Sequence, residues 1–366
     1  MRVLLIDLSK RFGGADVRVL QTAVNMPAGH EAAIAVLEGS AIHKDATAAG
    51  VRTFPLGFSR HDPRHAFALA RIAREFRADV VDAHNPQSQL WGMLAARLAG
   101  VRGQVATVHT VYREAHRGPI RQRGHEFAIR LAKHSNARFL TVSESIARYL
   151  HSFGIAAGRV TVSYNAMEPL SAVPKGAGLK RSLGLTEGEL LLGMVGRIEM
   201  VKGYDIMIDA IDRLRKAGQN FHVAIAGEGH DTGRIRAIIA ERGMENRFHF
   251  LGFRRDIPDV LADYDMLCVP SRSEGLPYTV LEAARQGVPI IATSVDGLGE
   301  VLEDGRTAIV IPPENSEALA NAIARAAADC GLRQQLSEAG AKMIVERFSI
   351  PRMIAETLAV YQSAIT

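Results

Sequence analysis

Short apolar runs alternate with longer stretches of helical periodicity along the chain of 366 residues. In the first half, each short apolar run predicts a buried strand. The stretches at 65–77 and 88–98, which lie between such runs, predict amphipathic helices. Alternation of strand and helix is typical of a parallel sheet covered on both faces. The predicted strands of this half are residues 3–7, 32–37, 80–83, 105–108 and 139–142.

The same alternation restarts after a Pro/Gly-rich stretch, with predicted helices at 204–216 and 234–242. The predicted strands there are residues 190–195, 221–226, 248–251, 266–269, 288–292 and 308–311. We therefore predict two Rossmann-like doubly wound domains that face each other across a ligand-binding cleft. The expected boundaries are 1–168 for the first domain, 169–188 for a linker, 189–350 for the second domain and 351–366 for a final helix.

Composition and cysteine content indicate the cellular compartment in which the protein is expected. Hydrophobic residues make up 47% of the chain, enough for two full cores, and the only cysteines are Cys268 and Cys330. Such sparse cysteine favours a reducing compartment. The apolar run at residues 3–6 ends at Asp7 and is too short for a signal peptide or a membrane span. We expect a cytoplasmic protein, with peripheral contact at the inner membrane face left open.

The net charge of +5 hides an asymmetry between the halves. Residues 1–168 carry +9 and the rest carry −4, so an acidic partner should meet the first half. Nucleic acid is not expected, because no DNA- or RNA-binding motif is present and aromatic residues are only 6%. The basic and apolar segment at 118–133 is compatible with two structures: a domain helix with a solvated basic face, which is favoured slightly, or a segment lying on an anionic membrane.

Two glutamates flank a loop-to-helix junction within residues 271–293. Glu274 lies in the Gly/Pro turn after an apolar strand, and Glu282 lies in the helix predicted at 278–286. Free N–H groups at such a helix start attract anions, so the pair indicates a ligand with both phosphate and hydroxyl groups. Continuous helix would separate their Cα atoms by about 12 Å. The catalytic carboxyl pair of a retaining glycosidase needs about 5–5.5 Å, so we interpret the two as clamps on an extended ligand.

A second motif follows the first strand of the second domain. Gly196 begins a turn that carries Arg197 and Lys202, a pair suited to two neighbouring phosphates because Arg binds oxygens bidentately and Lys acts as a point charge. The alternative is solvated loop charge. Gly227 and Gly229 end the next strand and would let another backbone or a base approach closely.

The first domain offers weaker candidates. Gly13 and Gly14 separate the first strand from the first helix, where a glycine pair permits positive φ and points N–H groups at an anion, although many α/β domains turn this way without a ligand. His109 ends a strand at the edge where ligands lie and can donate to a sugar hydroxyl. His84 has a similar place with weaker support. The pair of His61 and His65 lacks the companions of a metal site.

Together these motifs resemble the retaining glycosyltransferases of family 4, which have the GT-B fold. The resemblance covers most of the chain and is most specific across residues 193–311. It rests there on Gly196-Arg197, Lys202-Gly203, residues 226–229, Glu274 with Glu282, residues 287–292 and residues 315–317. The first domain agrees more loosely, and Ala166 follows Asn165 where the family usually has Gly. A C-terminal helix that crosses back to the first domain also fits the family.

The resemblance implies a role for each matching residue. Arg197 and Lys202 would hold the donor diphosphate and stabilise the leaving nucleotide, Glu282 would bind ribose, and Glu274 would bind the donor sugar. The amides of Gly275 and Leu276 would assist, His109 would line the sugar, and Gly13 and Gly14 would contact the donor or acceptor. The remaining donor-side residues by this resemblance are Gly196 and Gly227.

The implied activity is metal-independent transfer of a sugar from a nucleoside-diphosphate sugar to a hydroxyl of a glycan, lipid-linked or small-molecule acceptor. The acceptor would attack the face that the nucleotide leaves, which retains configuration, and no cofactor is expected. Two alternatives on the same fold are a nucleotide-sugar epimerase and a catalytically silent nucleotide-sugar-binding module. An NAD-dependent dehydrogenase is disfavoured because the spaced glycine fingerprint is missing. The donor base and sugar, the acceptor and the oligomeric state are not predicted.

Overall fold

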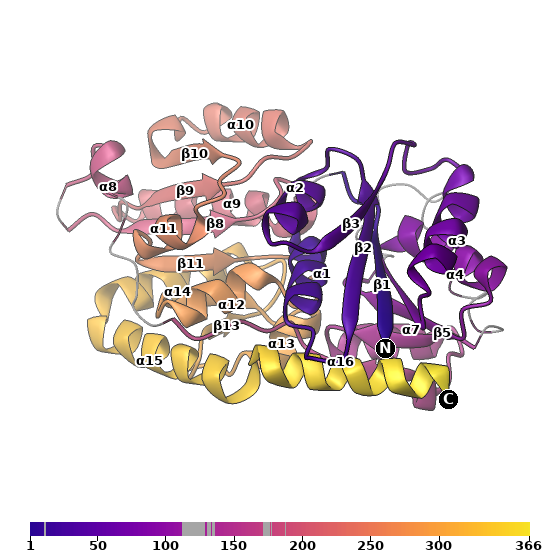
Figure 1. Cartoon of the computed structure of the whole chain (residues 1–366). Helices are drawn as coiled ribbons and strands as arrows, with labels where there is room; N and C mark the ends of the chain where they lie inside the picture. The colour runs from indigo at the N-terminus through magenta and orange to yellow at the C-terminus, as the bar shows by residue number, and fades with distance from the viewer. Residues whose placement is uncertain are drawn as a thin grey trace. The chain divides into compact units, whose positions relative to one another are not determined.

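The computed structural model describes the chain except residues 11, 112–128, 130–132, 134–135, 171–175, 177 and 187. Two compact units make up the chain. The first contains residues 1–165 together with 350–366, and the second contains residues 166–349. Most of the basic segment at 118–133 lies outside the described residues. Each unit is a Rossmann-like α/β domain (Figure 1).

The first unit is built on a parallel sheet of seven strands in the order β3-β2-β1-β4-β5-β6-β7. Its strands are β1 Arg2–Asp7, β2 Glu31–Leu37, β3 Arg52–Leu56, β4 Val80–His84, β5 Gly103–Val108, β6 Arg138–Thr141 and β7 Val160–Val162. The order reverses direction between β1 and β4, so the loops after these strands form the switch point where doubly wound sheets bind ligands. The predicted parallel sheet is confirmed, and the edge strands β3 and β7 were not predicted.

Helices cover this sheet on both faces, as the hydrophobic pattern requires. They are α1 Gly14–Val24, α2 Ala41–Ala48, α3 Arg64–Phe76, α4 Pro86–Ala99, α7 Glu144–Ser152, the short η1 Ala157–Arg159 and α16 Ile350–Ile365. Although α16 ends the chain, it packs on β5 and β6, and Val360 and Tyr361 join the core formed by Val3 and Leu5 (Figure 1). The predicted return of the final helix to the first domain is therefore confirmed.

The second unit is built on a parallel sheet of six strands in the order β10-β9-β8-β11-β12-β13. Its strands are β8 Leu191–Val195, β9 His222–Ala226, β10 Phe248–Gly252, β11 Met266–Val269, β12 Ile290–Thr293 and β13 Ile309–Ile311. The switch point lies between β8 and β11. The two candidate motifs of the sequence follow these two strands, so the fold brings them together.

The helices of the second unit cover the same kind of sheet. They are α8 Leu179–Ser182, α9 Tyr204–Lys216, α10 Thr232–Glu241, α11 Ile257–Ala262, α12 Tyr278–Arg285, α13 Asp296–Val301, α14 Ser316–Ala328 and α15 Cys330–Arg347, with the short helices η2 Met200–Lys202 and η3 Glu245–Arg247. The helix predicted after Glu274 is α12. Glu274 therefore lies before this helix and Glu282 lies within it, as predicted.

Candidate functional site

The loop after β8 presses against its neighbours because glycines leave room for it. A Cβ on Gly227 would lie 1.9 Å from the carbonyl oxygen of Gly196, and a Cβ on Gly203 would lie 1.9 Å from that of Pro270. Both glycines have positive φ, which disfavours any side chain. The close approach that the sequence predicted at Gly227 is thus an approach of backbone. The Gly227 amide donates to the carbonyl of Gly252.

The approach places Lys202 beside the loop after β11. Its Nζ lies 2.7 and 2.8 Å from the two carboxylate oxygens of Glu274, and Ser271 donates to the same carboxylate at 2.7 Å. Glu274 is only 7% exposed. The two residues that the resemblance assigns to phosphate and to sugar therefore form an ion pair with each other. One N–H of the ammonium remains for a further acceptor.

Two further residues hold the loop of Glu274 in place. Arg272 donates to both oxygens of Asp205 at 2.8 Å, and its amide donates to the carbonyl of Val201, which ties this loop to the one after β8. Asp296, the first residue of α13, accepts hydrogen bonds from the Ser273 hydroxyl at 2.6 Å and from the Glu274 amide at 3.1 Å. Glu274 is thus fixed at both its backbone and its carboxylate.

The amide of Gly275 is a candidate ligand-binding group. Gly275 is buried, yet no acceptor for its N–H exists among the residues that the structure describes. Buried amides are nearly always hydrogen-bonded, so an unmatched one at a candidate site indicates a missing partner. Leu276 is also buried and leads into α12.

Arg197 and Glu282 differ in how they are paired. The Arg197 guanidinium is exposed and donates to Glu199 at 2.7 Å. Glu282 on α12 is half-buried, and its carboxylate accepts no hydrogen bond from the described part of the chain. Burial raises the pKa of Glu282, and the charge of Arg285 opposes that rise. An unpaired, partly buried carboxylate is suited to accept hydrogen bonds from ligand hydroxyls.

In the first unit, the glycine pair differs from the prediction. Gly13 has φ −164° and neither glycine has positive φ, so the expected anion-binding turn is wrong in its conformation. The reason is Asp16, whose carboxyl group accepts a hydrogen bond from the Gly13 amide at 2.8 Å, while Gly14 starts α1. Burial and the nearby Asp7 raise the pKa of Asp16 to about 8.

His109 directly follows β5 and is half-buried. Its Nε2 lies 2.9 Å from Nδ1 of His84, and the two rings stack with centroids 5.2 Å apart. Burial lowers the pKa of His109 well below its ordinary value, and His84 and Arg18 lower it further while Asp82 opposes them. The ring is therefore neutral at physiological pH.

Nothing in the described part of the chain forms a metal centre, since no three His, Cys, Asp or Glu side chains gather there as ligands would. Cys268 and Cys330 are free. Among the described residues, none of the helices combines the length and the apolar character needed to cross a membrane.

Comparison with known proteins identifies the family. The model of "Glycosyl transferases group 1" matches residues 178–343, and that of "Glycosyltransferase Family 4" matches residues 12–169. The 2-deoxystreptamine glucosyltransferase of Streptomyces kanamyceticus is 30% identical over 317 residues, which cover 81% of this chain and 80% of that protein. The chain belongs to the group 1 glycosyltransferases. It is therefore a transferase enzyme, and the predicted resemblance is confirmed.

Other similar proteins support the fold of this glycosyltransferase. A crystal structure of Anabaena Alr3699/HepE in complex with UDP-glucose is 22% identical, covers 98% of this chain and 99% of that one, and has a TM-score of 0.86. A glycosyltransferase from Rickettsia africae is 18% identical over 100% of this chain and 98% of that one, with a TM-score of 0.79. The predicted GT-B class of fold is confirmed.

Several residues of the candidate site were not identified from the sequence. Ser271 and Ser273 stand beside Glu274 in the motif, and their spacing could have suggested that they support it. Asp296 and Asp205 carry no local signal, because they reach the site only through the folded loops.

Proposed function

We propose that this glycosyltransferase transfers a sugar from a nucleoside-diphosphate sugar to an acceptor hydroxyl. The observation that carries the proposal is the group at the switch point of the second unit, where the Lys202–Glu274 ion pair lies beside the unmatched amide of Gly275. An ammonium with one remaining N–H and a free amide together suit a phosphate oxygen. Arg197, exposed on the same loop as Lys202, supplies a second cation for the diphosphate.

We assign the remaining ligand groups by their chemistry. Glu282 lacks a partner among the described residues and can accept from two adjacent ribose hydroxyls. Glu274 can accept a hydrogen bond from a hydroxyl of the donor sugar once the Lys202 ammonium moves partly toward the phosphate. We assign His109 of the first unit to a hydroxyl of the substrate.

Relatives suggest which substrates to test. The HepE structure contains UDP-glucose, so a UDP-sugar is the first donor to test. One relative is named for 2-deoxystreptamine and another, the mannosyltransferase LpsB of Rhizobium meliloti, for the lipopolysaccharide core; the latter match spans 50% of this chain and 54% of that protein. We propose an acceptor hydroxyl of a small molecule, a lipid-linked sugar or a glycan.

Donor binding can be tested in the second unit by calorimetry and thermal shift with UDP-, GDP- and ADP-sugars. A ligand that binds only the native state raises its melting temperature. Lys202→Ala and Arg197→Ala should each weaken nucleoside diphosphate binding by about 10-fold or more, and Glu282→Ala should weaken nucleoside binding. Lys216→Ala is the matched control, because Lys216 also pairs with a carboxylate at 2.7 Å but lies at the far end of α9. Unchanged affinity in all three variants would contradict the assignment.

We further propose that transfer retains the anomeric configuration and needs no metal, because two cations already serve the leaving diphosphate. The proton coupling constant of the new anomeric centre, measured before the product equilibrates, should match that of the donor. Chelator should leave the rate unchanged. A product with inverted configuration would refute the retaining mechanism. Loss of the transfer rate in chelator would refute metal independence. With donor alone, a new sugar nucleotide would favour the epimerase, and slow hydrolysis favours the transferase.

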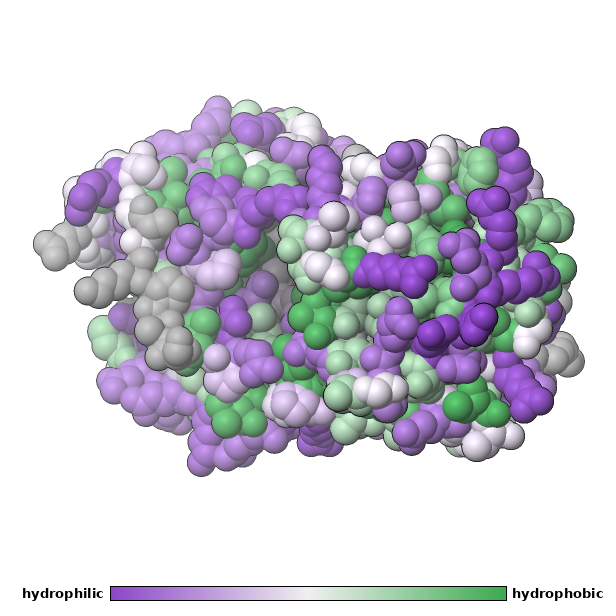
Figure 2. All heavy atoms as spheres, in the orientation of Figure 1, coloured by the Kyte–Doolittle hydropathy of each residue, from purple (hydrophilic) through white to green (hydrophobic). Residues whose placement is uncertain are grey.

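We also propose that the enzyme works in the cytoplasm and contacts an anionic membrane through α3 and α4, a surface of the first unit within the described residues. Phe67, Leu90, Leu94 and Leu98 are exposed there, Phe67 by 71%. Arginines lie among them, and Arg74 of α3 donates to the Leu98 carbonyl of α4, so the two helices form one surface. Hydrophobic and hydrophilic side chains intermix over these helices (Figure 2). The exposed arginines are Arg64, Arg71, Arg74 and Arg97.

Vesicle sedimentation tests this contact. Binding should require anionic lipid, weaken with added salt, and fall when Phe67 and Leu94 are both changed to Ser. Val345→Ser is the control, because Val345 is 58% exposed but lies on α15 of the second unit. Binding that ignores lipid charge, or that the double variant leaves intact, would remove the proposal.

A further inference from the structure

A line of hydrogen-bonding groups runs through the first unit behind His109. Tyr361 of α16 donates to Asp82 at 2.6 Å, and Thr107 of β5 lies 2.9 and 3.0 Å from the same carboxylate. Asp82 lies 3.4 Å from Nε2 of His84, whose Nδ1 lies 2.9 Å from His109. Asp82, His84 and Tyr361 are almost completely buried, whereas His109 reaches the surface.

The arrangement determines where the protons lie. Burial raises the pKa of Asp82, but the neighbouring imidazole of His84 and the hydrogen bonds from Tyr361 and Thr107 outweigh this, so the net direction is downward and Asp82 is a carboxylate. A carboxylate beside Nε2 of His84 requires the proton on that nitrogen. With one proton on His84, at Nε2, its Nδ1 is an acceptor, so His109 donates from its own Nε2.

The outer nitrogen of His109 is therefore an acceptor. Its Nδ1 bonds to no residue in the described part of the chain and is not a buried, unpartnered atom, so it is accessible to a ligand. If Nδ1 of His84 also carried a proton, it would donate to Nε2 of His109, and His109 would then hold its own proton on Nδ1. Protonation of the pair thus converts the outer nitrogen from acceptor to donor.

We propose that Asp82 and His84 are positioning residues that hold His109 in the Nε2–H tautomer, so that its Nδ1 accepts a hydrogen bond from a substrate hydroxyl. Tyr361 links this arrangement to α16. The role of His109 toward substrate rests on the proposed function, whereas the tautomer is a property of the first unit alone.

Other charged groups face the pair and act on its titration. Arg18 of α1 is buried, lies near His109 and lowers its pKa; its guanidinium donates to the carbonyls of Ser163 and Tyr164 and to the hydroxyl of Thr357. Asp7 at the end of β1 interacts electrostatically with the pair through His84. Burial raises the pKa of Asp7, although His84 opposes that rise. Substitution of Asp82 removes the carboxylate nearest to His84 and leaves these groups in place.

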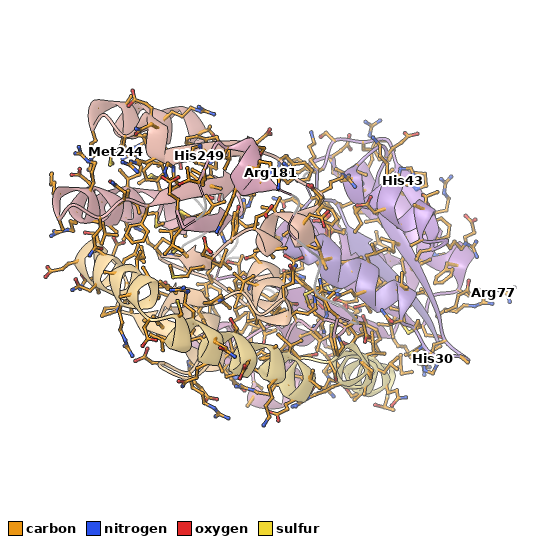
Figure 3. The ribbon with its side chains drawn as sticks, turned by 90° about the vertical axis from the view of Figure 1, so that its left-hand side faces the viewer. His30, His43, Arg77, Arg181, Met244 and His249 are labelled. Atoms are coloured by element: carbon orange, nitrogen blue, oxygen red, sulfur yellow. The ribbon has the colours of Figure 1, made fainter. Side chains whose placement is uncertain are left out.

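A matched control exists in the second unit. His222 and His249 stack in the same way, with Nδ1 and Nε2 3.0 Å apart, and Glu189 lies 3.5 Å from Nε2 of His222. His222 begins β9, so this pair lies toward the amino ends of its strands, whereas ligands of such sheets bind at the carboxyl ends. His249, labelled in Figure 3, comes from β10.

The tautomer is measured by imidazole ¹⁵N chemical shifts in protein labelled at its 13 histidines, with assignment from His84→Gln and His109→Gln. Near neutral pH both His84 and His109 should carry the proton on Nε2. Asp82→Asn should shift the ¹⁵N signals of both rings, and Glu189→Gln should shift only those of His222 and His249. A bare Nε2 on His109 in the wild type, or unchanged shifts of the pair in Asp82→Asn, would overturn the proposal.

The pH profile of kcat/KM supplies a readout that a purely structural role would not move. Without the carboxylate the protonated pair is less stable, so Asp82→Asn should move the acid limb to lower pH by about one unit. Tyr361→Phe removes one donor from Asp82, makes it a stronger base and should move the limb to higher pH. The Tyr361→Phe variant also tests the proposal if Asp82→Asn fails to fold. If the acid limb of the kcat/KM profile lies at the wild-type pH in both variants, the proposal is overturned.

A separate result would bear on the proposed function alone. If His109→Gln transfers sugar as fast as the wild type, the substrate role of His109 is wrong, while the ¹⁵N shifts still decide the tautomer. Glu189→Gln should leave the pH profile unchanged, and a shift equal to that of Asp82→Asn would refute the assignment to the first pair.

Discussion

Lys202 and Glu274 neutralise each other at the switch point of the second unit, and this pairing has a consequence for binding. Under the proposed function, a nucleoside diphosphate draws the ammonium partly away from the carboxylate. A complete donor would restore the balance, because its sugar would supply hydroxyls for Glu274. The pair would therefore favour donor with sugar over the bare nucleotide.

Glu274→Gln should separate these two effects. The neutral amide no longer holds Lys202, so affinity for a bare nucleoside diphosphate should rise severalfold, while kcat for sugar transfer should fall by at least about 10-fold. Titration calorimetry and a transfer assay measure the two. Asp212→Asn is the control, since Asp212 pairs with Lys216 on α9. A loss of nucleotide affinity in Glu274→Gln would mean that the carboxylate organises Lys202 instead of competing for it.

Asp16 makes the stability of the first unit depend on pH. Its pKa is raised to about 8 by burial and by Asp7, so its stabilising contribution is complete below the ordinary carboxyl pKa near 4 and is lost as pH rises toward 8. The slope for one such group is at most about 1.4 kcal/mol per pH unit. Asp16→Asn keeps an oxygen for the Gly13 amide and should be stabilised relative to the wild type increasingly from pH 5 to 8. Chemical denaturation across this range tests it, and a constant difference would contradict the buried proton.

At the scale of elements, the loop after β8 depends on close contact between backbones. The loop lies against Gly227 and Gly229, which follow β9, and its Gly203 lies against Pro270, which follows β11. This contact positions Lys202, the last residue of η2, beside Glu274 in the loop after β11. Packing of glycines is thus the physical origin of the site.

Gly227→Ala should therefore damage both stability and binding. The added Cβ would overlap the Gly196 carbonyl oxygen, and we expect a loss of about 1–3 kcal/mol in the free energy of unfolding together with weaker nucleotide binding. Gly218→Ala is the control, because Gly218 also has positive φ but has no atom within 4 Å of a new Cβ. Equal losses in the two variants would show that backbone strain, and not the contact, is responsible.

At the scale of the whole chain, the last helix completes the first unit. Helix α16 adds Met353, Val360 and Tyr361 to the buried side chains of that unit, and Tyr361 bonds to Asp82 of β4. The two compact units are therefore not two consecutive halves of the sequence. The second unit is inserted between β7 and α16.

Deletion of residues 350–366 should destabilise the first unit selectively. It would uncover apolar side chains of β4, β5 and β6, so the unfolding transition of this unit should move to lower temperature in calorimetry. Lys202 and Glu282 remain, so nucleotide should still shift the melting of the second unit. A joint loss of both transitions would show that the units depend on each other for stability.

Much of this architecture follows from the order of residues. Apolar runs of strand length between amphipathic helices predict parallel sheets, and local motifs around Lys202, Glu274 and Glu282 predict the donor site because each lies within one short segment. The edge strands β3 and β7 escaped prediction for a local reason. Strand β3 contains Pro55 and is half-exposed, which weakens its hydrophobic pattern.

The chain by itself determined the class of fold and the family, and it predicted the donor residues, since all of these depend on local patterns and spacings. Only the tertiary structure decided how those residues are used. Lys202 meets Glu274 across 72 positions, Tyr361 meets Asp82 across 279, and Gly13 lost its expected turn to Asp16. Proton positions and ion pairs depend on burial and on distances of a few ångströms, and these exist only once the strands have been set side by side.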